Sequence, residues 1–124
     1  MSTADIRSKL VGEAAVIYPG PYLNQLRGER IERHCLDLLA RGIRNLVINF
    51  EETELVNSIG ISLLLEAIDA VDEANGKVVL ASLNTTNREL LEVLGILSKV
   101  EVAINEDAAL TAFAGLTTAG GVML

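Results

Sequence analysis

The sequence contains few aromatic side chains, and this limits the kind of hydrophobic core that the chain can build. Its 124 residues include two tyrosines, two phenylalanines and no tryptophan, although half of all residues are hydrophobic. The core must therefore be assembled from Leu, Ile, Val and Ala. Such a composition is typical of an α/β domain in which short helices pack on a sheet. The length fits one domain with a core of its own.

Cysteine and basic residues are also scarce. The single cysteine, Cys35, cannot form an internal disulfide, which favours a reducing compartment. The formal net charge is −7, whereas nucleic acids and anionic membrane surfaces attract basic patches. No apolar run approaches the roughly 20 residues of a membrane span, and residues 1–5 lack the pattern of a signal peptide. We therefore expect a cytoplasmic protein that binds neither nucleic acid nor membrane.

The motifs of common catalytic and cofactor sites are missing. The sequence has no Gly-rich nucleotide-binding loop, no Cys/His metal spacing and no set of nucleophile, base and acid. Ser58 does not belong to a Gly-x-Ser-x-Gly motif, because Val56 stands two positions before it. The acidic segment Glu51–Glu54 does not match a Ca²⁺-binding loop and is expected to be solvated. The sequence thus predicts no enzyme activity, no cofactor and no metal site.

Apolar periodicity predicts an α/β fold with one mixed β-sheet and about four α-helices. The expected elements are a hairpin over residues 5–18 that turns at Gly12 and Glu13, strands over 43–50, 77–81 and 100–104, and helices over 25–40, from 61 to Asn75, from 86 to Gly95, and after Asn105. The first strand pair should be antiparallel, and the later strands should be parallel with right-handed crossovers. We expect one domain over residues 1–115 and a flexible C-terminal tail over 116–124.

Polar residues and glycines mark the ends of the predicted helices. Asn24 and Asn105 are well placed as N-caps. Thr86 and Glu89 match the capping-box pattern, in which a hydroxyl residue is followed three positions later by Glu. Gly95–Ile96 matches the C-terminal pattern of a left-handed glycine followed by an apolar contact.

Ser58 stands at the junction between the strand over 43–50 and the next helix. A helix start has unpaired N–H groups and a positive dipole end, so it can hold a phosphate or present a serine hydroxyl. Serine is also a preferred N-cap, and the two roles are compatible. Gly60 is expected to let the helix start approach the sheet closely.

The order of elements, together with Asn57–Leu64 (Asn-Ser-Ile-Gly-Ile-Ser-Leu-Leu), resembles the STAS domain. More narrowly, it resembles the bacterial anti-sigma-factor antagonists. The resemblance extends over roughly residues 9–113 and includes Gly20 and Leu94–Ile96. It implies that Ser58 accepts a phosphoryl group from a serine kinase that is itself the anti-sigma factor. The unphosphorylated antagonist binds this kinase and frees the sigma factor, the phosphorylated form does not bind, and a phosphatase resets the cycle.

The resemblance also implies a partner surface and reveals departures from the family pattern. The implied surface comprises Asn24, Asn57, Ile59 and Gly60, on a monomer or weak homodimer. Acids usually stand where this chain has Asn24, Asn49 and Asn57, and asparagine keeps the hydrogen-bonding shape without the charge. Residues such as Asn24 and Asn57 are more often caps and turn residues than binding groups, so only the resemblance makes them interface candidates. The alternative function is a non-switching STAS adaptor in a stressosome-like or transport complex.

Overall fold

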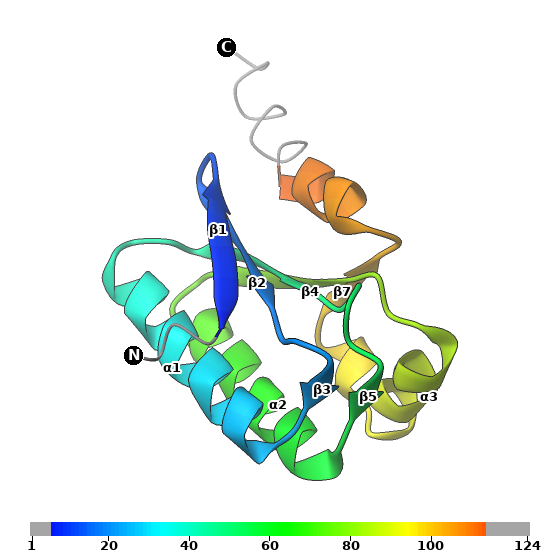
Figure 1. Cartoon of the computed structure of the whole chain (residues 1–124). Helices are drawn as coiled ribbons and strands as arrows, with labels where there is room; N and C mark the ends of the chain where they lie inside the picture. Colours follow the sequence, from blue (N-terminus) through cyan, green and yellow to red (C-terminus); the bar gives the residue numbers. More distant parts are fainter. Residues whose placement is uncertain (1–5, 114–124) are drawn as a thin grey trace.

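A five-stranded mixed sheet forms the centre of the structure (Figure 1). The computed structural model describes residues 6–113. The strands are, in spatial order, β1 (Arg7–Val11), β2 (Ala14–Tyr18), β4 (Asn45–Asn49), β6 (Lys77–Ala81) and β7 (Glu101–Ala103). β1 and β2 are antiparallel, and each later neighbouring pair is parallel. The predicted mixed sheet is confirmed. The predicted domain end at residue 115 and the predicted tail lie outside the described residues.

Helices cover both faces of this sheet, but unequally (Figure 1). On one face lie α1 (Gln25–Ala40), α2 (Ser58–Glu73) and α3 (Thr85–Val93), the last followed by a 3₁₀ turn at Ile96–Ser98. On the other face lies one short helix over residues 106–113. The four predicted helices are therefore present. α2 begins three residues earlier than predicted, so Ser58 is its first helical residue.

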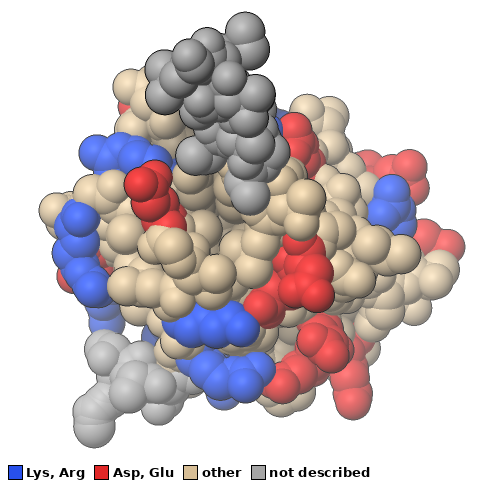
Figure 2. Space-filling model, turned by 90° about the horizontal axis from the view of Figure 1, so that it is seen from above, with Lys and Arg blue, Asp and Glu red and all other residues tan. Residues whose placement is uncertain are grey.

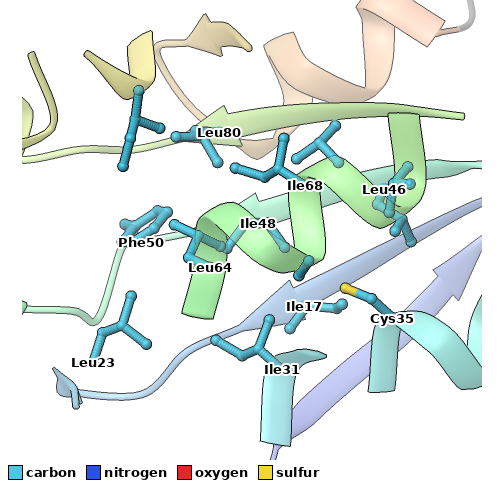
Figure 3. Close-up of a cluster of buried hydrophobic side chains, with 14 of the residues drawn as sticks. Ile17, Leu23, Ile31, Cys35, Leu46, Ile48, Phe50, Leu64, Ile68 and Leu80 are labelled. Atoms are coloured by element: carbon cyan, nitrogen blue, oxygen red, sulfur yellow. The ribbon is translucent and has the colours of Figure 1, made fainter. Parts of the chain in front are cut away.

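Aliphatic side chains fill the core on both sides of the sheet. Because successive strand residues point to opposite faces, β2 sends Ile17 toward α1 and α2 and Val16 toward the helix over 106–113. The larger cluster includes the buried Cys35. Figure 3 shows part of it, with labelled side chains from the strands and both long helices: Ile17, Leu46, Ile48, Leu80, Ile31, Leu64 and Ile68.

The structure also contains a second, very small sheet that the sequence did not predict. β3 (Tyr22–Leu23) and β5 (Leu55–Val56) pair in parallel, with Tyr22 opposite Leu55 and Leu23 opposite Val56. Strands of two residues are too short to produce a periodic signal. The pairing buries Leu23 fully, whereas Tyr22 and Leu55 remain exposed. It also joins the loop after β2 to the segment that leads into α2.

Asparagine caps the start of every helix within residues 6–113. The caps are Asn24, Asn57, Asn84 and Asn105. Each side-chain oxygen accepts a hydrogen bond from the backbone N–H three residues later, at 2.7–3.0 Å. Asn24 and Asn105 were predicted correctly. The expectations that Ser58 or Thr86 caps a helix are wrong, because Ser58 and Thr85 already lie inside their helices and the preceding asparagines satisfy the N–H groups.

Charged side chains of both signs lie on the face seen from above (Figure 2). Ion pairs join Arg7 to Glu52 at 2.9 Å and Lys77 to Glu101 at 2.8 Å. These pairs are largely exposed, so each contributes little to the free energy of folding. Across residues 6–113, none of the helices has the length and apolar character needed to cross a membrane.

Candidate functional site at the start of helix α2

Ser58 is an exposed side chain at the first position of α2. It follows β5 and the cap Asn57, so its backbone is held at both ends by regular structure. Its carbonyl oxygen accepts a hydrogen bond from the Ser62 hydroxyl one turn later, at 3.0 Å. Ser62 is thus bonded back to its own helix, whereas the Ser58 side chain faces solvent at the helix start.

Asn57 connects the start of α2 to the small sheet. Its side-chain oxygen accepts from the Gly60 N–H at 2.8 Å, and its side-chain nitrogen donates to the Tyr22 hydroxyl at 3.2 Å. Its backbone N–H donates to the carbonyl of Leu23 at 3.0 Å. Three hydrogen bonds therefore fix the residue immediately before Ser58.

Gly60 allows α2 to approach β3 more closely than any other residue would. A Cβ atom built on Gly60 would lie 2.4 Å from the carbonyl oxygen of Leu23 and 3.0 Å from that of Asn24. Both obstacles are backbone atoms, which cannot rotate away. This is the close approach that the sequence suggested. Gly60 is buried, so it shapes the site and offers no side chain to a partner.

Large apolar side chains are exposed on the elements that meet around Ser58. Leu55 is 58% exposed, Ile59 52%, Leu26 52% and Tyr22 42%. Tyr22 and Leu55 are neighbours across the β3–β5 pair, while Leu26 and Ile59 lie in the first turns of α1 and α2. We call these four residues the α2-start patch. Exposed apolar groups that gather in this way are typical of protein-binding surfaces.

The loop before β5 is anchored by a buried threonine that sequence analysis placed in a solvated segment. Thr53 is 2% exposed, and its hydroxyl donates to the carbonyl of Gly20 at 2.7 Å. Its own carbonyl accepts from the side chain of Asn87, which is also buried, at 3.0 Å. No sequence pattern singles out Thr53 or Asn87, because their roles depend on α3 lying beside the loop.

A second polar cluster ties the helix over 106–113 to the end of β4. Asn49, which is 1% exposed, donates to Glu106 at 2.9 Å and accepts from the Glu51 N–H at 2.8 Å. Tyr18 donates to the same Glu106 oxygen at 2.6 Å, and Lys9 contacts the other oxygen at 2.8 Å. Burial alone would raise the pKa of Glu106, but the hydrogen bonds from Lys9, Tyr18 and Asn49 outweigh it and lower that pKa.

His34 takes no part in this site. It is partly exposed on α1, and its Nε2 lies 2.8 Å from the Ser8 hydroxyl. Burial lowers the pKa of His34. Among residues 6–113, no three His, Cys, Asp or Glu side chains are grouped so as to hold a metal ion.

Comparisons with known proteins agree with this architecture. A BtrV protein of Bordetella bronchiseptica, described as a candidate anti-sigma factor antagonist, is 28% identical over 91 residues, which are 73% of this chain and 78% of BtrV. An anti-sigma-factor antagonist (STAS) domain protein from Planctomyces limnophilus is 26% identical, with a TM-score of 0.77 over 90% of this chain and 99% of that one.

More distant structures share the fold alone. The anti-sigma factor antagonist SpoIIAA in its unphosphorylated form is 18% identical, with a TM-score of 0.71 over 89% of this chain and 98% of that one. A sulfate transporter family protein from Wolinella succinogenes is 14% identical, with a TM-score of 0.76 over 87% and 89%. The family model of the STAS domain matches residues 10–109, most of the sequence. The chain therefore belongs to the STAS domain family.

Proposed function

We propose that the protein is a cytoplasmic anti-sigma-factor antagonist that binds an anti-sigma serine kinase and loses this binding when Ser58 is phosphorylated. The observation that carries the proposal is the position of Ser58, exposed at the first residue of α2, next to the exposed Ile59 and shortly after the exposed Leu55 of β5. Family membership and the names of the relatives support the same role. On this proposal the protein is a binding module without catalysis or cofactor of its own.

The geometry suits phosphoryl transfer to the Ser58 hydroxyl by a kinase. The side chain is exposed, while the hydrogen bonds of Asn57 and the close contact of Gly60 hold its backbone in place. Positioning and charge stabilisation dominate catalysis of phosphoryl transfer, so a rigid, protruding acceptor is a favourable substrate. The resulting phosphate would lie near the positive end of the α2 dipole, where a negative charge is favourable.

The same phosphate would disfavour docking of the partner. It would place about two negative charges among the apolar side chains of Leu55, Ile59 and Tyr22, which a partner would cover. The exposed Glu54 lies close by in the sequence and adds charge of the same sign. Desolvation and like-charge repulsion together provide the switch.

The proposed partner surface differs in detail from the one first expected. Asn24, Asn57 and Ile59 remain candidates for contact, and the two asparagines also cap α1 and α2. Tyr22 and Leu55 join them because the β3–β5 pair sets them opposite each other, and Leu26 joins as an exposed apolar side chain in the first turn of α1.

A second candidate function is a STAS adaptor that does not switch. The fold shared with the sulfate transporter family protein of Wolinella succinogenes favours this alternative. Such an adaptor would bind its partner equally well whether Ser58 is neutral or charged. A stressosome-like complex is a further setting of this kind.

Mass spectrometry after incubation with the cognate anti-sigma kinase and ATP tests the proposal. We expect one phosphate on the wild type and on Ser62→Ala, and none on Ser58→Ala.

In a binding assay, Leu55→Asp should weaken the complex with the kinase by at least about tenfold, because a charge enters the desolvated patch. The absence of phosphate on Ser58, or equal binding by Ser58→Glu and wild type, would favour the adaptor.

A further inference from the structure

β1 forms one edge of the five-stranded sheet and pairs only with β2 in the part of the chain that the structure describes (Figure 1). All five of its residues are exposed. An edge strand of this kind presents a row of unpaired N–H and C=O groups, which can pair with a strand of another chain. The strand at the opposite edge, β7, has only three residues. β1 is therefore the edge better suited to receive another strand.

The register of the β1–β2 hairpin fixes which backbone groups of β1 point away from the sheet. A two-residue turn connects Val11 to its partner Ala14. Such a hairpin closes with a hydrogen-bonded pair, and hydrogen-bonded pairs alternate along an antiparallel ladder. Every second residue, counted back from Val11, therefore bonds to β2. The N–H and C=O groups of Ser8 and Leu10 point instead to the free edge.

The side chains of β1 alternate between the two faces of the sheet. Ser8 lies on the α1 face, where its hydroxyl is 2.8 Å from His34. Lys9 lies on the other face and contacts Glu106 at 2.8 Å. Leu10 must then lie on the α1 face, but it is 54% exposed, so α1 leaves it largely uncovered. The free edge thus combines a large apolar side chain with outward-pointing backbone groups.

Charge disfavours most of the ways in which two copies of β1 could pair about a two-fold axis. Registers centred on Arg7 or on Lys9 set two identical cations in a non-hydrogen-bonded pair, where side chains are closest. The register centred on Ser8 sets Arg7 opposite Lys9 of the second copy. Like charges directly opposite each other destabilise a sheet. Ion pairs with Glu52 and Glu106 weaken this repulsion but do not remove it, because both cationic side chains remain at least half exposed.

The register centred on Leu10 brings complementary side chains together. The two Leu10 side chains face each other across the axis and form an apolar pair. Lys9 faces the apolar Val11 of the second copy. Arg7 faces Glu13 of the second copy, which carries the opposite charge. Apolar pairs and pairs of opposite charge both stabilise neighbouring strands.

We propose that two copies of this chain associate through β1, which pairs antiparallel with its counterpart about a two-fold axis at Leu10. The two sheets join into one, and each Leu10 covers the other where α1 leaves it open. The contact uses the same residues of both copies, as two-fold symmetry requires. Because it consists mainly of one strand from each copy, the dimer is weak and depends on protein concentration. The inference does not depend on the proposed function, because Ser58 is not part of β1.

Sedimentation equilibrium of the full chain at several protein concentrations tests the proposal. We expect a monomer–dimer equilibrium for the wild type. Leu10→Lys should lower the association constant by at least about tenfold, because two facing cations replace the central apolar pair. Val93→Lys is the matched control and should leave the constant unchanged, because Val93 is an exposed apolar residue of α3, away from β1.

An exchange of charges tests the register. Arg7→Glu should weaken the association, because two acidic side chains then face each other across the interface. The double variant Arg7→Glu/Glu13→Arg should restore the association constant of the wild type. This restoration is specific to the register centred on Leu10, since Arg7 faces Glu13 in no other register considered above.

Disulfide crosslinking measures the register independently. The Cα atoms of a hydrogen-bonded antiparallel pair are about 5.5 Å apart, within the range of a disulfide. An oxidant such as copper phenanthroline should therefore convert Leu10→Cys to a covalent dimer. Lys9→Cys should remain monomeric, because its two copies are offset along the strands beyond the limit of roughly 7 Å. The wild type is the control, since its single cysteine, Cys35, is buried.

Three outcomes would overturn the proposal. The first is a wild type that remains monomeric at every concentration. The second is an equal association constant for Leu10→Lys and wild type, which would place any dimer contact elsewhere. The third is faster crosslinking of Lys9→Cys than of Leu10→Cys, which would contradict the register. Similar urea unfolding of Leu10→Lys and wild type in dilute solution shows that the variant retains its fold.

Discussion

The side-chain amide of Asn57 donates a hydrogen bond to the hydroxyl of Tyr22 at 3.2 Å, while its oxygen caps α2 through the Gly60 N–H at 2.8 Å. One amide therefore ties the helix start to the small sheet. An aspartate here could still cap α2, and the Tyr22 hydroxyl could reverse its role and donate to the carboxylate. Compared with an aspartate at this position, Asn57 thus keeps the same geometry next to Ser58 and lacks only the negative charge.

Substitutions at Asn57 should separate the cap from the charge. Asn57→Ala should lower the free energy of unfolding by about 1 kcal/mol, because the α2 cap is lost. Asn57→Asp should leave it unchanged or raise it by up to about 1 kcal/mol, because a negative charge is favourable at a helix start. Urea-induced unfolding measures both values, and Tyr22→Phe isolates the contribution of the hydroxyl. Equal stability of Asn57→Ala and wild type would contradict the role of the cap.

Gly60→Ala should destabilise the protein by about 1 to 3 kcal/mol, as overpacking does in a well-packed interior. The added methyl group would lie 2.4 Å from the carbonyl oxygen of Leu23, so either α2 or β3 must shift. Ser62→Ala, on the exposed side of the same helix, is the matched control and should change the free energy of unfolding by less than about 0.5 kcal/mol. Similar values for the two variants would show that the close approach does not constrain the fold.

Asn49 and Glu106 should behave as a coupled pair. Asn49→Asp would set a buried carboxylate within about 3 Å of Glu106 and should destabilise the protein by at least about 1 kcal/mol. Glu106→Gln removes the repulsion, so the double variant should be more stable than the sum of the single effects predicts. A double-mutant cycle from urea unfolding gives the coupling energy, which is expected to be about 1 kcal/mol or more. Additive effects would mean that the 2.9 Å contact carries no energy.

The hydrogen bonds to Glu106 should make stability depend on acid pH. Its pKa in the folded protein is lowered from the ordinary value of 4.5, so the ionised form stabilises the fold above that value. This stabilisation is lost as the pH falls through the lowered pKa. Unfolding of wild type and Glu106→Gln from about pH 7 to about pH 3 should therefore show a difference in stability that shrinks on acidification. A constant difference would exclude a linkage through Glu106.

Cys35 should be unreactive in the folded protein. Burial and, secondarily, the nearby charge of Glu32 raise the pKa of its thiol to about 12. The thiolate is the reactive form, and almost none is present at neutral pH. A thiol reagent such as iodoacetamide should therefore modify Cys35 only after denaturation, as intact-mass spectrometry can show. Rapid modification under native conditions would indicate local opening between α1 and the sheet.

Sequence reasoning worked best where a local pattern is long or chemically distinctive. The α1 range, the hairpin turn and the caps Asn24 and Asn105 follow from apolar periodicity and from the short side chains that satisfy helix N–H groups. The sequence also predicted Gly95 at the end of α3, because few other residues adopt a φ of 79°. The placement of Ser58 at a strand-to-helix junction depended on the same signals.

Adjacent candidates for one local role could not be separated by sequence alone. Ser58 and Asn57 are both good caps, as are Thr86 and Asn84, and the helix start is decided by which backbone N–H groups each side chain reaches. That choice follows from how the preceding segment enters the helix. For α2 the entry is fixed by the bond from the Asn57 N–H to the carbonyl of Leu23, a residue far away in the chain.

The α/β architecture, the Leu, Ile and Val core, and a serine where a strand leads into a helix follow from the amino-acid pattern. The β3–β5 pair, the close contact of Gly60 with Leu23, and the buried bonds of Thr53 and Asn49 arise in the folded chain alone. The physical reason is that the first group depends on neighbours a few residues apart, whose spacing the sequence records. The second group depends on backbone and polar atoms that the packed fold brings together from distant segments.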